Sequence, residues 1–142
     1  MTCTPTMHWS GRKGTDTNTS LWASFHIEEL PEDGSRGLSF FHAGDTGTPE
    51  RHDPSHAACP LTAPFTCPDS IGYSPTLFEA VGQVLGPVTL AAIPIGSYGP
   101  RWHLQLHHED PLGATHLSQD IGARYSFGVH WGTCVWPVTH RR

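Results

Sequence analysis

The feature that most constrains the fold is a continuous apolar segment, Val88 to Ile95, that lies between two segments with helical character. A short apolar run of this kind is typical of a strand that is buried on both faces. Before it, a helix is predicted to begin at Pro75 behind a Ser74 cap, because apolar residues recur at helical spacing from Leu77 to Leu85. Gly86-Pro87 would end that helix. After it, a second helix is predicted to begin behind Asp110-Pro111 and to reach about Gly122. Helices that alternate with buried strands predict an α/β layered fold.

Three further strands are predicted, and two of them end at residues that can carry chemistry. The segment Thr19 to Phe25 alternates in polarity, and Gly37 to His42 and Arg124 to His130 also have strand character. Asp45 follows the second of these strands, and His130 ends the third. Functional residues of layered α/β folds commonly lie at the carboxyl ends of strands. We therefore expect Asp45 and His130 to lie on one rim, and His8, which precedes the first strand, to join them.

Between the second strand and the first helix, residues Thr48 to Gly72 contain five prolines and have little periodicity. This composition predicts a disordered insert inside a single domain, because a loop of this length is uncommon in a compact fold. The tail from Cys134 to Arg142 has no strand or helix pattern. The 142 residues are otherwise enough for one domain with a real core.

Composition excludes some classes of function and leaves one anomaly. The formal charge is −5, which gives no basic surface and predicts no nucleic-acid partner. No apolar run is long enough to cross a membrane, and no secretory signal is visible at the start. The four cysteines form no CxxC pair, which favours a reducing, cytoplasmic setting. The eleven histidines, however, outnumber the eight Lys and Arg residues, and histidine is the commonest ligand of zinc-like metals.

Each candidate residue also has a structural interpretation when it is taken alone. Asp45, in the sequence GDTG, fits a turn residue that bonds its own backbone as well as a carboxylate that bridges two metal ions. A single histidine such as His8 or His130 is more often structural than a ligand. His108 lies in a polar stretch that fits a solvated loop before a capped helix, or a group that transfers protons or orients a substrate. Pattern alone leaves these alternatives open.

A second group of possible metal ligands lies in the middle loop. His52 and His56 have a spacing that resembles a zinc-binding pair, and Cys59 and Cys67 are near them. Pro54 opposes the helix that would align the two histidines, and the cysteines are too far apart for a zinc knuckle. We therefore assign this group to the disordered insert.

Several motifs, taken together and in order, resemble the N-acylphosphatidylethanolamine-hydrolysing phospholipase D family of the metallo-β-lactamase superfamily. They cover roughly 110 residues by this alignment of motifs and leave out the insert and the tail. The motif AGDTG is only moderately specific, whereas AIPIG, PRW and HWGT are far more so. The matching segments are HWSGR (8–12), LWASF (21–25), FFHAGDTG (40–47), LAAIPIGSYGPRW (90–102), HEDP (108–111) and HWGT (130–133).

The resemblance implies an αββα sandwich with two zinc ions at one edge. By position, His8 would bind the first ion, Asp45 would bridge both ions and His130 would bind the second. His108 would lie in the active site near the substrate phosphate, so that His108 and Asp45 are the implied catalytic residues. The implied reaction is hydrolysis of N-acylphosphatidylethanolamine to an N-acylethanolamine and phosphatidic acid, with peripheral contact to intracellular membranes.

One family motif is absent. The cluster HxHxDH, which supplies four further metal ligands in the family, does not occur in this sequence. The sequence is thus expected to be a C-terminal half-domain that is inactive alone and that exposes the apolar face of its sheet, with a homodimer as one form of association. Two rival functions remain: a non-catalytic protein that pairs with another half-domain, and a superfamily hydrolase that acts on a soluble phosphodiester or lactone.

Overall fold

A five-stranded mixed β-sheet organises the protein in a computed structural model that describes residues 1–20, 22–48 and 76–133, without the side chain of Trp102. The segments predicted as an insert (from 49 on) and as a tail (134–142) lie outside the described residues. The elements, in chain order, are β1 (Thr2–Thr4), β2 (Ser24–Glu28), β3 (Ser39–His42), α1 (Leu77–Leu85), β4 (Leu90–Pro94), α2 (Arg101–Leu104), α3 (Pro111–Asp120) and β5 (Tyr125–Val129).

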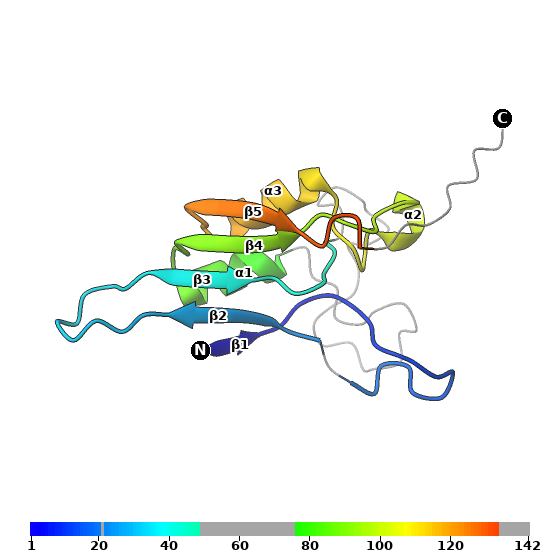
Figure 1. Ribbon diagram of the computed structural model, residues 1–142, viewed down its shortest axis with the longest axis horizontal. Coiled ribbons are helices and arrows are strands. Elements are labelled where there is room, and N and C mark those ends of the chain that lie inside the picture. The colour runs from blue at the N-terminus through cyan, green and yellow to red at the C-terminus, as the bar shows by residue number, and fades with distance from the viewer. Residues whose placement is uncertain (21, 49–75, 134–142) are drawn as a thin grey trace.

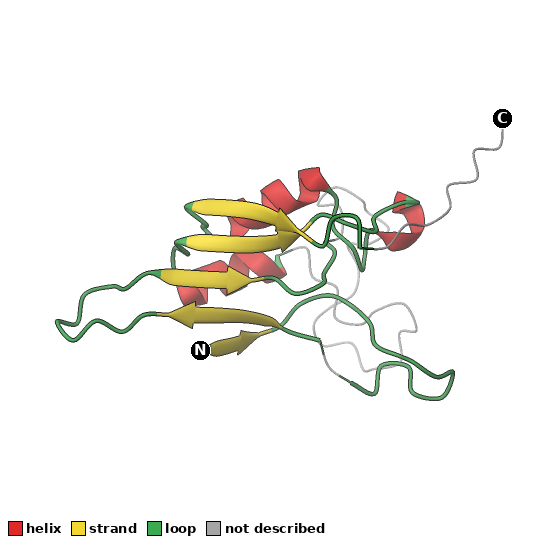
Figure 2. Ribbon diagram, in the orientation of Figure 1, coloured by secondary structure: helices red, strands yellow, loops and turns green. Residues whose placement is uncertain are grey.

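The strands follow one another across the sheet in chain order. β1, β2 and β3 pair antiparallel, whereas β3, β4 and β5 pair parallel. The two parallel connections contain α1 and α3, and both helices lie on the same face of the sheet (Figure 1, Figure 2). The predicted α/β class is therefore confirmed as a mixed sheet with helices on one side. None of the described helices has the length and apolar character needed to cross a membrane.

One predicted strand was displaced, and two short elements were not predicted. The strand expected at Thr19 to Phe25 begins only at Ser24, because the backbone N–H and the hydroxyl of Thr19 both bond the carbonyl of Asp16 and hold this stretch in a turn. β1 and α2 have only three and four residues, too few for a periodic pattern.

The end of α1 and the start of α3 lie where the sequence indicates. α1 begins at Leu77 behind Thr76, and the predicted cap at Ser74 with Pro75 lies outside the described residues. α1 ends at Gly86, which has a φ of 71°, a conformation that glycine adopts readily. α3 begins behind Asp110, whose carboxylate accepts a hydrogen bond of 2.7 Å from the backbone N–H of Gly113, with Pro111 at the first helical position. Both predicted helices are thus confirmed.

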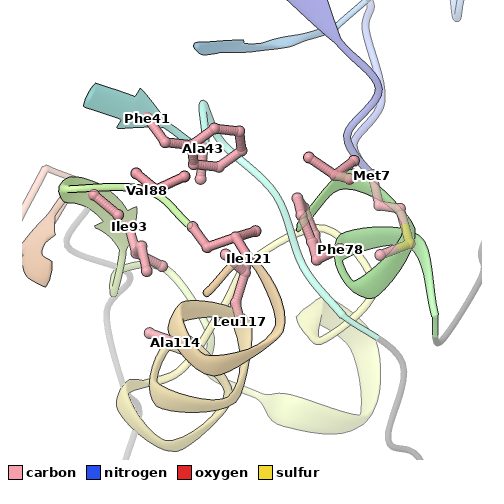
Figure 3. Close-up of a cluster of buried hydrophobic side chains, with 11 residues drawn as sticks. Met7, Phe41, Ala43, Phe78, Val88, Ile93, Ala114, Leu117 and Ile121 are labelled. Carbon is pink, nitrogen blue, oxygen red and sulfur yellow. The ribbon is translucent and has the colours of Figure 1, made fainter. Parts of the chain in front are cut away.

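The hydrophobic core lies between the sheet and the two longer helices (Figure 3). Phe41 of β3 and Ile93 of β4 are buried in it together with Leu117 of α3. Phe78 of α1 belongs to the same cluster, as does Met7, which is only 1% exposed. Met7 therefore anchors in the core a loop that has no regular secondary structure and that carries His8.

The opposite face of the sheet has no covering layer among the described residues. Strand register places Leu90 beside Tyr125 and Ala92 beside Phe127, all on the side away from the helices. The large apolar side chains on this face are between 38% and 59% exposed: Phe25, Ile27, Leu90, Tyr125 and Phe127. We call these five residues the bare face. Its exposure agrees with the sequence-based expectation of an uncovered apolar sheet, and a contiguous apolar surface of this kind is uncommon on a monomer.

Candidate metal centre

Four polar residues from four separate segments meet near the carboxyl ends of the parallel strands. Asp45 lies three residues beyond β3, and His130 directly follows β5. His8 lies in the loop between β1 and β2, and His108 lies shortly before α3. Because parallel strands end at the same edge of a sheet, the first two residues are brought together by topology alone. The predicted convergence of His8, Asp45 and His130 is observed, and His108 joins them.

The Asp45 carboxylate is the centre of this group. Its Oδ2 lies 3.1 Å from Nε2 of His8 and 3.5 Å from Nε2 of His130, and its Oδ1 lies 3.1 Å from Nδ1 of His108. One ligand atom from each of His8, Asp45 and His108 lies within 4.8 Å of the others. The rings of His8 and His108 meet edge to face at 5.2 Å, and those of His108 and His130 are stacked at 5.8 Å.

The facing atoms are close but are not aligned as hydrogen bonds. Nε2 of His8, Oδ1 of Asp45 and Nδ1 of His108 are all buried and lack a hydrogen-bond partner among the described residues. Buried polar atoms are normally paired, so a group of unpaired atoms directed at one point requires an explanation. A metal ion supplies one, since imidazole nitrogens and a carboxylate are the donors that zinc prefers. These residues therefore fit a zinc ion.

His8 also has the second contact that metal-binding histidines usually have. Its Nδ1 lies 2.7 Å from the backbone carbonyl of Trp9, which can only accept a hydrogen bond. In neutral His8 the proton is therefore on Nδ1, and the lone pair of Nε2 points toward Asp45. This contact both orients the ring and leaves the ligand atom unprotonated.

The charges of the site reinforce one another in the absence of metal. Burial alone would raise the pKa of Asp45, but His108 and His8 beside it bring that pKa far below its ordinary value. Burial alone would lower the pKa of His8, but Asp45 and the Trp9 carbonyl raise it overall. Asp45 is therefore ionised at neutral pH, as a metal ligand must be.

Two buried backbone contacts place His8 beside Asp45. The hydroxyl of Thr46 accepts a hydrogen bond of 3.0 Å from the N–H of Met7, and the N–H of Gly47 donates to the carbonyl of Met7 at 3.1 Å. Thr46 is fully buried. The GDTG segment thus holds Met7, the residue next to His8, through both its backbone N–H and its carbonyl. Sequence analysis singled out Asp45 in this motif but not Thr46.

Two glycines allow the loops of the site to approach closely. A methyl group on Gly47 would overlap the carbonyl oxygen of Gln105, and one on Gly96 would overlap the carbonyl oxygen of His130. The first contact joins the Asp45 loop to the segment that leads to His108. The second brings the end of β4 against His130, whose φ is 65°. Both glycines belong to motifs that carry the family resemblance, GDTG and AIPIG.

His107 is a neighbour of the site that sequence analysis did not identify. Its ring lies edge to face with that of His8, with the centroids 6.0 Å apart. Burial and the nearby His8 and His108 lower the pKa of His107 to about 4. It therefore stays neutral near pH 7. The pair of adjacent histidines was the only signal in the sequence, and it did not show which of them faces Asp45.

Glu109 was also missed, because burial cannot be read from a sequence. It is only 2% exposed, and its carboxylate accepts a hydrogen bond from the hydroxyl of Thr48. Burial raises its pKa to about 7, although Thr48 and Arg101 act in the opposite direction. Arg101 itself pairs with Asp110, the residue that caps α3.

The alternative histidine and cysteine group of the middle loop, His52, His56, Cys59 and Cys67, lies outside the described residues. Among the residues that the structure describes, the group formed by His8, Asp45 and His108 is the one whose side chains can hold a metal ion.

Comparison with known proteins identifies relatives of this chain. No family model matches it. It is 37% identical over 136 residues to the mitochondrial N-acyl-phosphatidylethanolamine-hydrolysing phospholipase D of Saccharomyces cerevisiae, with 95% of this chain and 23% of that protein covered. It is 45% identical over 75 residues to N-acyl-phosphatidylethanolamine-hydrolysing phospholipase D 1 of Caenorhabditis elegans, with 53% of this chain and 21% of that protein covered. The chain thus spans less than a quarter of the length of these relatives. Its homologues are N-acyl-phosphatidylethanolamine-hydrolysing phospholipases D, which confirms the family resemblance predicted from the sequence.

Proposed function

We propose that this chain supplies part of the active site of a zinc-dependent phosphodiesterase of phospholipase D type. The substrate would be N-acylphosphatidylethanolamine, and the products an N-acylethanolamine and phosphatidic acid. The observation that carries this proposal is the half-buried Asp45 carboxylate, whose Oδ1 and the nearby nitrogens of His8 and His108 are buried without a hydrogen-bond partner among the described residues. The names of the relatives support the substrate class.

In this proposal His8, Asp45 and His108 would hold one zinc ion, and His130 would serve a second ion that shares the Asp45 carboxylate. Asp45 is suited to serve two ions, because each of its two oxygens has a histidine nitrogen within 3.5 Å. Bound zinc supplies Lewis-acid chemistry toward the phosphate and lowers the pKa of water. The sequence contains no HxHxDH cluster, so the remaining ligands of a two-ion centre would come from outside this chain.

His108 has two tasks in this proposal, and substitution separates them. Its Nδ1 faces Asp45, which favours a role as ligand, whereas the family resemblance implies a position near the substrate phosphate. We expect His108→Ala to weaken zinc binding at least as much as the loss of a residue behind a ligand does, which is about tenfold to hundredfold. Unchanged zinc affinity in this variant would show that His108 acts only near the substrate phosphate and is not a metal ligand.

The bare face supports the αββα assignment. A sheet with helices on one side and large apolar side chains on the other needs a second layer to cover it. We propose that this layer is the complementary half of the domain and that the chain alone does not turn over substrate. We also propose peripheral contact with the cytoplasmic side of intracellular membranes, because a phospholipid substrate is presented at a membrane surface.

A chimaera tests the proposed function directly. This chain would replace the matching 23% of the yeast relative, and hydrolysis of N-acylphosphatidylethanolamine in mixed vesicles would be measured. We expect the chimaera to be active with zinc and Asp45→Asn in the same chimaera to be inactive. A folded, zinc-loaded chimaera without activity would contradict the proposal.

The bare face also favours a second candidate function, a non-catalytic protein that pairs with another half-domain or with a second copy of itself. Its exposed aromatic and aliphatic residues are those expected of an association surface. The same chimaera separates the two, because a chain kept only for association would not restore hydrolysis. Activity toward soluble phosphodiesters or lactones but not toward the phospholipid would instead indicate another hydrolase of the superfamily.

A further inference from the structure

Glu109 is a buried carboxyl group next to the proposed metal site that no step of the proposed function uses. It is 2% exposed, and acidic side chains are almost never buried to this extent without a partner. The hydroxyl of Thr48 donates a hydrogen bond to its Oε2, with the two oxygens 2.5 Å apart. This hydrogen bond therefore holds the Glu109 carboxyl group in one position.

The first turn of α3 provides space for this carboxyl group. A methyl group on Gly113 would overlap Oε1 of Glu109, so the carboxyl group lies in the space that a side chain on this residue would otherwise occupy. The neighbouring Asp110 caps the same turn through the N–H of Gly113 and pairs with Arg101 of α2. Glu109 is thus enclosed between the first turn of α3 and Thr48.

The two partners of this hydrogen bond lie in different segments, one of which carries Asp45 and the other His108. Thr48 is three residues after Asp45, and Glu109 directly follows His108. Between the same two segments, Gly47 packs against the backbone of Gln105 and His107. The Thr48–Glu109 hydrogen bond therefore closes a second connection between the Asp45 loop and the His108 segment, next to the approach of Asp45 Oδ1 to His108 Nδ1 at 3.1 Å.

We propose that Glu109 and Thr48 form a positioning pair that holds His108 against Asp45, so that both can bind one metal ion. The functional meaning of this pair rests on the proposed metal site. Glu109 is a positioning residue rather than a ligand, because its carboxylate is bonded to Thr48 and seated against α3. A pair that fixes the distance between two ligands changes metal affinity, as residues behind metal ligands generally do.

Four variants and one control test the pair in the whole chain. Thr48→Val and Glu109→Leu remove one partner each, whereas Thr48→Ser and Glu109→Gln keep a hydroxyl donor and an oxygen acceptor. Val88→Ala is the control for lost stability, because Val88 is buried in the core at the other end of β4. Zinc affinity, the thermal midpoint of the metal-free chain and the ¹⁵N signals of the His108 ring would be measured for each.

We expect zinc affinity to fall about tenfold or more in Thr48→Val and Glu109→Leu and to stay within about threefold of wild type in Thr48→Ser and Glu109→Gln. The Val88→Ala control should lose stability and keep its zinc affinity. The inference would be overturned if Thr48→Val and Glu109→Leu lose stability but bind zinc like wild type. The contact would then be purely structural.

The failure of the proposed metal site gives a different result. If wild type binds no zinc, the proposed function is wrong, and the ¹⁵N signals of the metal-free chain decide the positioning role. Shifted His108 signals in Thr48→Val and Glu109→Leu, with unshifted signals in the two conservative variants and in Val88→Ala, would still support the pair. Unshifted signals in all variants would overturn it.

Discussion

The hydroxyl of the fully buried Thr46 accepts a hydrogen bond from the backbone N–H of Met7 and donates one to the carbonyl of Gly47. Through this residue the loop that carries Asp45 holds the loop that carries His8. Neither loop has regular secondary structure, so the position of the first candidate ligand depends on a few such contacts and on the burial of the Met7 side chain.

Replacement of Thr46 by valine should therefore loosen the site and the fold together. Thr46→Val keeps the shape of the side chain but leaves the N–H of Met7 buried without a partner, which costs about 1–3 kcal/mol. We expect a loss of this size in urea unfolding of the metal-free chain. Thr46→Ser keeps both hydrogen bonds and should lose much less. Equal stability of the valine and serine variants would show that the hydroxyl contributes nothing.

Gly47 should not tolerate even one added methyl group. The side chain of Gly47→Ala would overlap the backbone around Gln105, so the Asp45 loop would have to shift. Overpacking of this kind costs about 1–3 kcal/mol, and zinc affinity should fall as well. Gly14→Ala is the matched control, because a methyl group there meets no atom within 4 Å. Similar unfolding curves for the two alanine variants would contradict the predicted close approach.

The pairing of His8 with Asp45 predicts a pH-dependent difference between wild type and Asp45→Asn without metal. His8 has a raised pKa, so its contribution to stability is full below about pH 6.5 and is lost as pH rises through its folded pKa. Asp45 has a lowered pKa, so its contribution is present above about pH 4 and is lost as pH falls through its folded pKa. The difference in the free energy of unfolding should thus be largest between about pH 4 and 6.5.

Urea unfolding across this pH range would measure the difference. The buried His26 and His107 titrate in both variants and largely cancel from it. Zinc should move the stability maximum of wild type to higher pH, because it binds neutral histidine and competes with protons. A difference that grows steadily from pH 6 to pH 8 without metal would have the wrong sign for this pair.

The bare face predicts self-association of the isolated chain. Phe127→Ser removes a large apolar side chain from the β5 edge of this face and should shift the chain toward monomer in light scattering after size-exclusion chromatography. Val84→Ser, on the exposed side of α1, removes an apolar residue that is 84% exposed and should not. Identical association of both variants would exclude the bare face as the contact surface.

Sequence reasoning located Asp45 and His130 because both follow strands, and the ends of parallel strands meet. It predicted α3 correctly because Asp110 and Pro111 mark the start of the helix. It did not find Thr46, Thr48 or Glu109, since their roles arise from burial and from contacts between distant segments. The early strand was displaced because the turn at Asp16 to Thr19 depends on hydrogen bonds that no polarity pattern shows.

Whether Asp45 and the histidines around it hold zinc is decided by zinc titration with metal analysis of the purified chain, compared with Asp45→Asn. We expect wild type to bind zinc weakly, at fewer than two ions per chain, and Asp45→Asn to lower the affinity by at least about tenfold. Equal binding by wild type and Asp45→Asn would contradict the site, and two tightly bound ions with phosphodiesterase activity would contradict its incompleteness.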